Sequence, residues 1–238
     1  MSFSIPPEIK NQIMTLATCT QSAAAIHLTI SQVVHPCMEK LLYQNIIIHG
    51  QEDANRFLQC LYWRLMPVEF AHKSVKALFL VGSIEPSTVI EIISLCSGLI
   101  SLHLTLRNNQ FAMDVSSLWR ILDVLPLKSL VLTLNMQFEP FLSVAHTFTH
   151  LSHFEVNRNH FLGLPREMLD SIQPLTHLCA VLSPHFADPD AVAHLISNAR
   201  LRLIAFRVED SHIDVEEFLE ENSICDRRIV LLPAELPV

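Results

Sequence analysis

Thirteen histidines are the side chains of this 238-residue sequence that are best suited to do chemistry. The tightest group is His146, His150, His153 and His160, and the first two are four residues apart, which on a helix places them on one face. Helical zinc sites of this spacing carry a glutamate in the pattern H-E-x-x-H, and no glutamate lies between His146 and His150. We therefore predict no metal site.

Motifs for catalysis and for phosphate binding are absent from the sequence. Its four glycines, Gly50, Gly82, Gly98 and Gly163, lie too far apart to form a phosphate-binding loop. The nucleophile motif G-x-S-x-G does not occur, and no spacing of serine, histidine and aspartate singles out a triad. We predict a protein that is not an enzyme and that holds no cofactor.

Composition and charge exclude two classes of partner. Half of the residues are hydrophobic, 17% are charged, and the formal net charge is −8. An acidic chain without a basic stripe is poorly suited to nucleic acid, and the acidic run from Glu209 to Glu221 is typical of a solvated helix face. The most apolar stretch, Val89 to Leu106, contains Glu91 and His103 and is too interrupted to span a membrane.

Cysteine usage and the N-terminal sequence indicate the compartment. None of the six cysteines forms a C-x-x-C pair, and most lie within apolar runs, which predicts buried free thiols in a reducing environment. The N-terminus has neither the basic nor the apolar region of a secretory signal. We expect a cytoplasmic or nuclear protein.

A repeated pattern, apolar-x-x-apolar-x-apolar, dominates the rest of the chain. Its six copies begin at Val75, Leu99, Leu127, Leu151, Leu175 and Leu201, in steps of 24, 28, 24, 24 and 26 residues, and a weaker copy contains Ile229 and Leu231. Helical spacing of apolar residues follows most copies, at 86–96, 115–125, 165–173, after Asp188, and at 214–222. The pattern predicts that its later apolar positions are buried, namely Leu102, Leu104, Leu130, Leu132, Leu178 and Phe206.

Units of strand, turn and helix of this length stack into a solenoid, so we predict an α/β fold from residue 75 to 238. Its parallel strands would line a concave face, with the helices outside. Residues 1–50 read as a helical N-terminal module with helical stretches at 22–34 and 36–43 and a β-branched, strand-like segment at 46–48. Residues 51–74 read as a connecting helix and linker. Trp63 and Trp119 are expected to pack in the outer layer.

Strand residues that alternate with the core positions would face the concavity. His153 and His177 hold the same position in consecutive copies, so we expect them side by side. We interpret this face as the site for a protein partner, although an ordinary solvated sheet face would show the same mixture of side chains. The candidate partner-binding residues are His103, Thr105, Val131, Thr133, His153, Glu155, His177 and Arg207.

Two parts of the sequence resemble a known family. Asn135 and Asn159 stand three residues after the last apolar position of their copies, as in leucine-rich repeats, so the repeats resemble degenerate members of that class. The opening Ile5-Pro-Pro-Glu-Ile9, followed by Ile13, Leu16 and Ala17, resembles the start of an F-box. Residues 25–46 and 226–233 are similar to segments of fungal F-box-like proteins with irregular leucine-rich repeats, although Leu28-Thr-Ile-Ser-Gln32 replaces the family's V-C-[RK]-x-W core.

The resemblance implies a function. An F-box docks on the adaptor subunit of a cullin-type (SCF) ubiquitin ligase, and the repeats would capture the protein to be ubiquitylated. The adaptor-docking candidates are Ile5, Pro6, Ile9, Ile13 and Leu16. Two hypotheses stay open: a substrate-recognition subunit of such a ligase, and a leucine-rich-repeat scaffold without a ligase link. The same apolar face could instead be buried against the first repeat, under Phe70, Val75 and Leu78.

Overall fold

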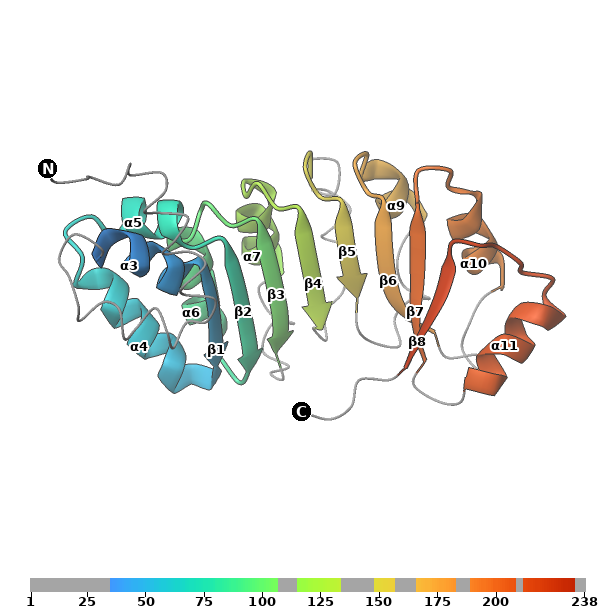
Figure 1. The fold of residues 1–238 in the computed structure, drawn as a ribbon, viewed down its shortest axis with the longest axis horizontal. Coiled ribbons are helices and arrows are strands. Elements are labelled where there is room, and N and C mark those ends of the chain that lie inside the picture. Colours follow the sequence, from blue (N-terminus) through green and yellow to red (C-terminus); the bar gives the residue numbers. More distant parts are fainter. Residues whose placement is uncertain are drawn as a thin grey trace, which may run out of the picture.

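A single parallel sheet runs through the molecule (Figure 1). The structure is a computed structural model and describes residues 35–106, 115–133, 148–156, 166–182, 189–208 and 212–233. Within them, eight strands follow one another in chain order, and each pairs in parallel with the next. The strands are β1 Asn45–His49, β2 Ala77–Gly82, β3 Ser101–Leu106, β4 Ser129–Thr133, β5 His153–Val156, β6 His177–Leu182, β7 Leu203–Val208 and β8 Ile229–Pro233.

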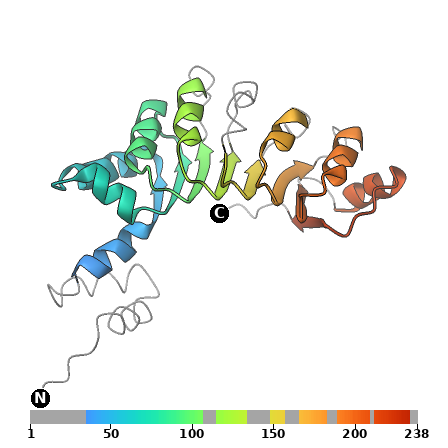
Figure 2. The ribbon, with the colours of Figure 1, turned by 90° about the horizontal axis from the view of Figure 1, so that it is seen from above.

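Helices alternate with these strands, as the sequence predicts. They are α3 His35–Gln44, α4 Gly50–Tyr62, α5 Pro67–Ser74, α6 Pro86–Leu95, α7 Val115–Asp123, α9 Arg166–Ser171, α10 Pro189–Ser197 and α11 His212–Glu221. Helices α6, α7, α9, α10 and α11 lie together on one side of the sheet (Figure 2). The other side, which we call the open face, corresponds to the predicted concave side.

Aliphatic side chains that point toward the helices form the core. Half-buried and buried residues alternate along β3 and β4, and the six predicted core residues are all at most 1% exposed. Parallel pairing stacks equivalent residues in rows, because strands that pair in register place side chains of one position side by side. One such row is Leu78, Leu102, Leu130, Phe154, Leu178 and Ile204.

A repeated hydrogen-bond pattern joins neighbouring units just before their strands. The carbonyl oxygen of Lys76 accepts hydrogen bonds from the amides of Ile100 and Ser101, at 2.9 and 3.0 Å. The carbonyls of Ile100, Lys128, Ser152 and Thr176 each accept two amides of the following unit in the same way. The junctions therefore share one geometry although the sequence between them varies in length.

The sheet begins one strand before the predicted start at Val75. Strand β1 pairs with β2 so that Ile46 aligns with Leu78 and Ile48 with Leu80. Tyr43, Ile46 and Ile48 thus repeat the apolar-x-x-apolar-x-apolar pattern, and Ile48 is 2% exposed. The spacing from Tyr43 to Val75 is longer than the other steps because both α4 and α5 lie between β1 and β2. Part of the predicted linker is in fact α5, which begins at Pro67.

The last strand is held by an arginine. The Arg228 guanidinium donates hydrogen bonds to the carbonyl oxygens of Asn198 and Leu201, both at 2.9 Å, and pairs with the Asp226 carboxylate at 2.7 Å. Hydrogen bonds from the side chain and the backbone amide of Arg228 to the Asp226 carboxylate lower the pKa of Asp226 to about 2. The weak seventh copy of the pattern is therefore a strand, β8, whose Leu231 aligns with Phe206.

The turn position that holds asparagine in two copies is described only after β2. Ser83 is exposed there, and the preceding Gly82 has a φ of 93°, a backbone conformation that favours glycine. Asn135, Asn159 and the equivalent residues of the other copies lie outside the described residues.

Two expectations about single residues are partly wrong. Trp119 is 1% exposed, but Trp63 is 84% exposed, because α4 ends at Tyr62 and Trp63 follows it as a capping residue. Among the described cysteines Cys96 is buried, which raises its pKa to about 12, whereas Cys60 and Cys225 are exposed. Apolar neighbours in the sequence did not indicate burial for these two thiols. None of the described helices is long and apolar enough to cross a membrane.

A matched pair of substitutions on β3 tests this arrangement. Leu102→Asp places a carboxylate in the core, where no partner compensates its lost hydration, and should reduce the free energy of unfolding by more than about 4 kcal/mol. Ser101→Asp, one residue earlier and on the open face, should change it by less than about 1 kcal/mol. Urea denaturation measures both, and similar losses for the two variants would contradict the assignment of faces.

Candidate functional site

All eight candidate partner-binding residues lie on strands and alternate with buried residues. Their side chains belong to the open face, where each is half-buried or, for His153, exposed. Pairing in register arranges the face in rows. The row of the two histidines contains Ala77, Ser101, Ser129, His153, His177 and Leu203, and the next contains Phe79, His103, Val131, Glu155, Cys179 and Ala205.

A groove of about 280 Å³ crosses the open face from β4 to β8. Five of the eight candidates line it: Val131, His153, Glu155, His177 and Arg207. The other three, His103, Thr105 and Thr133, lie beside it on β3 and β4, where the His103 Nε2 and Thr105 Oγ1 atoms are 2.7 Å apart. The remaining wall includes Ser129, Cys179, Leu203, Ala205 and Leu232.

Leu232 is a groove residue from the last strand, for which the sequence analysis assigned no open-face positions. It aligns with Arg207 in the pairing of β7 and β8. The signal was present, because Ile229 and Leu231 mark the core positions of the last copy and Leu232 follows them on the opposite face. The copy was too weak for its open-face residues to be assigned.

The two histidines are neighbours, as predicted. His153 pairs with His177 across β5 and β6, and their rings are stacked, with centroids 4.2 Å apart and planes inclined by 10°. Because the rings are stacked in parallel, their nitrogen lone pairs do not converge on a common position where a metal ion could bind both. Among the described residues no group of three histidine, cysteine or acidic side chains could hold a metal ion. His146 and His160 lie outside those residues.

Hydroxyl groups fix which nitrogen of each ring carries the proton. The Thr176 hydroxyl donates to the Ser152 carbonyl at 3.2 Å and lies 2.8 Å from His177 Nδ1. A hydroxyl has one proton, so when it donates that proton to the carbonyl its oxygen accepts from an Nδ1–H. Ser152 acts in the same way between the Lys128 carbonyl and His153 Nδ1. Both neutral rings therefore keep Nε2 as a hydrogen-bond acceptor.

The environment of His177 disfavours its charged form. Partial burial lowers the pKa of His177, and positive charge on His153 and on Arg202 lowers it further. The pair consequently resists the uptake of a second proton. The lowered pKa favours the neutral imidazole of His177 in the groove.

An ion pair spans the strand between β5 and β7. Arg207 Nε donates to Glu155 Oε1 at 2.8 Å, and the two side chains are 23% and 20% exposed. The pair reaches across β6, which lies between their strands. Opposite charges cancel in the groove floor, so a bound segment meets polar groups without a net charge from this pair.

The adaptor-docking candidates Ile5, Pro6, Ile9, Ile13 and Leu16 lie outside the described residues. Of the residues suggested to cover them, Val75 and Leu78 are fully buried in the core, and Phe70 packs edge-on against Tyr43. No protein-family profile matches the chain, and no curated protein matches it.

The histidine pair gives a measurable titration. His153→Asn removes the stacked ring and its charge, so the pKa of His177 should rise toward the ordinary histidine value. His150→Asn, at an exposed position outside the groove, should leave that pKa unchanged. NMR titration of the ring protons measures both. An unchanged His177 titration in His153→Asn would show that the rings are not coupled.

Proposed function

We propose that this chain is a protein-interaction protein that binds a segment of a partner protein in the groove of the open face. The observation that carries the proposal is the groove itself, to which five neighbouring strands, β4 to β8, contribute side chains on a stretch of the open face that no described helix covers. Stacked strand–helix units commonly use such faces to bind partners.

The lining determines what kind of segment would fit. Val131, Leu203 and Leu232 offer apolar contact, and the imidazoles of His153 and His177 offer acceptors. The Glu155–Arg207 pair adds polar groups whose charges cancel. A complementary segment therefore carries apolar side chains and hydrogen-bond donors, the mixture that protein interfaces use.

We further propose that the repeats are degenerate leucine-rich repeats and that the chain is the substrate-recognition subunit of a cullin-type (SCF) ubiquitin ligase in the cytoplasm or nucleus. The regular leucine positions support the first part, and the F-box-like sequence from Ile5 to Leu16 supports the second. In this role residues 1–50 would dock on the adaptor while the groove captures the substrate. A scaffold without a ligase link would use the same groove.

Selection from a random peptide library tests the groove without knowledge of the partner. Peptides enriched on the native chain should lose at least about tenfold in affinity for Ser129→Arg, because the long cationic side chain would enter the groove. Ser101→Arg is the matched control: Ser101 pairs with Ser129 in the sheet but does not line the groove. Titration calorimetry gives the affinities, and equal binding to all three proteins would place the site elsewhere.

A pull-down with the ligase adaptor separates the two forms of the proposal. Residues 28–32 lack the basic and tryptophan anchors of the family, and the loss of two anchors at about 2 kcal/mol each weakens binding by roughly three orders of magnitude. We expect weak binding that Ile9→Asp abolishes and that Asn11→Asp, off the apolar face, preserves. No adaptor binding by the native chain would exclude the ligase link and leave the scaffold.

A further inference from the structure

Large apolar side chains gather at the turn between α4 and α5. Trp63 is 84% exposed and Leu65 is fully exposed, and Tyr62, Met66 and Val68 are each more than half exposed. We call these five residues the turn patch. Protein surfaces seldom collect so many large apolar side chains in seven consecutive positions unless something covers them.

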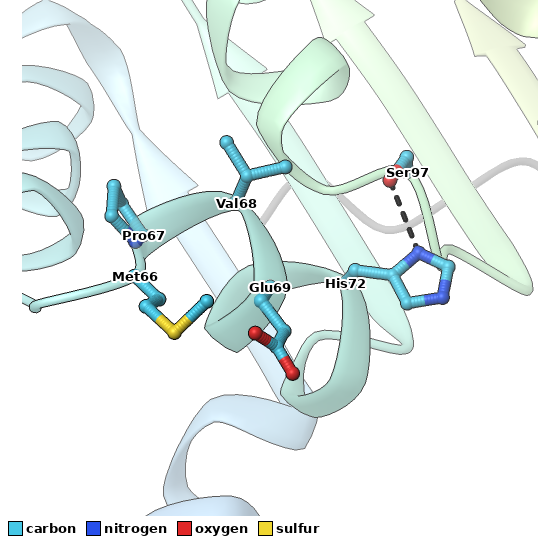
Figure 3. A pocket seen from close by; sticks show the side chains of 6 residues that line it. All are labelled: Met66, Pro67, Val68, Glu69, His72 and Ser97. Atoms are coloured by element: carbon cyan, nitrogen blue, oxygen red, sulfur yellow. Dashed lines mark hydrogen bonds between the residues drawn. The ribbon is translucent and has the colours of Figure 1, made fainter.

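A pocket of about 510 Å³ adjoins the turn patch. Met66 and Pro67 lie at one end of it, and the pair of His72 and Ser97, hydrogen-bonded at 3.1 Å, lies at the other (Figure 3). Met66, Pro67 and Val68 give it an apolar wall, and its polar residues are already paired: His72 with Ser97, and Glu69 with Lys73. The pocket therefore suits aliphatic side chains more than a charged ligand.

Arg64 joins the turn between α4 and α5 to the middle and end of α3. Its guanidinium carbon lies 4.6 Å from the centre of the Phe70 ring and 5.3 Å from that of Tyr43, and it forms an ion pair with Glu39 of α3. This arrangement holds the turn, α5 and α3 together. The chain enters α3 at His35, four residues or about 6 Å along the helix from Glu39. Residues 1–34 are thus connected to the helix that Arg64 joins to the turn.

The sequence of residues 1–34 fits an apolar site. Glu8 and Lys10 are its only acidic or basic side chains apart from His27, and Ile5, Ile9, Ile13 and Leu16 recur at helical spacing on one face. The 18 residues from 17 to 34 could span roughly 60 Å when extended, and a tether of this kind gives an effective concentration on the order of millimolar. Even a weak contact would therefore be well populated.

We infer that the apolar face of residues 5–16 docks on the turn patch and its pocket, within the same chain. This inference does not rest on the proposed function, because neither the patch nor the pocket includes a residue of the groove. The docking would compete with adaptor binding if the chain is a ligase subunit. The same side chains cannot contact the adaptor while they are docked, so adaptor binding would require their release.

Tryptophan fluorescence reports the docking directly. The chain has two tryptophans, and Trp119 is buried, so acrylamide quenching reads the access of solvent to Trp63. We expect Trp63 to be shielded in the native chain of residues 1–238. Ile9→Asp should raise the quenching constant roughly twofold or more, because one of the two tryptophans becomes open to the quencher. Asn11→Asp, on the opposite side of the predicted helix, should not change it.

A substitution in the turn patch tests the same docking independently. Leu65→Asp alters a fully exposed residue, so the fold is retained, and it should raise quenching as Ile9→Asp does. Val124→Asp, at an exposed apolar residue after α7, is the matched control and should leave quenching unchanged. Equal quenching in the native chain and in both test variants would overturn the inference. Shielding that disappears on dilution would also overturn it, because a second copy would then be the occupant.

Discussion

Stacking of incomplete units is the constraint on which this structure depends. A single strand with its helix cannot bury its own apolar side, so each unit is stable only between neighbours. The rows of leucine and isoleucine at matching positions are the physical form of this dependence, with Leu78, Leu102 and Leu130 each fully buried. The shared carbonyl before each strand fixes how one unit follows the next. Together they explain why steps of unequal length still give one regular sheet.

The ends of the stack need separate solutions, because an end unit has a neighbour on one side only. At the C-terminal end Arg228 joins β8 to carbonyl groups at the end of α10 and beyond it. At the N-terminal end α3 packs beside α5. Arg64 joins the two helices, because its guanidinium contacts both the Tyr43 ring of α3 and the Phe70 ring of α5. That end keeps its apolar turn exposed in the described part of the chain, and a docked segment would complete it.

The side chains of the open face do not form the core between the sheet and the helices, so one position can hold different residue types in successive strands. The same row contains serine at β3 and β4, histidine at β5 and β6, and leucine at β7. Variation on a regular backbone is how a repeat protein acquires a particular binding surface. Here it produces stacked imidazoles whose Nδ1 protons are directed by Thr176 and Ser152, beside an ion pair that spans a strand. The groove lies where these features meet.

The apolar pattern in the sequence determined the strands, their parallel order and the faces of their residues, because burial in a stacked sheet demands one period and one alternation. It predicted that His153 and His177 adjoin, and the register confirms it. Ile46 to Ile48 is strand-like in the sequence, but the pattern did not assign this strand, β1, to the repeats, because its copy at Tyr43, Ile46 and Ile48 is separated from the next by two helices. Only tertiary structure decided that Glu155 and Arg207 pair across β6, and that Trp63 is exposed while Trp119 is buried. The ion pair depends on the distance between units two strands apart, and the exposure of Trp63 depends on where α4 ends. A local pattern of residue types specifies neither of them.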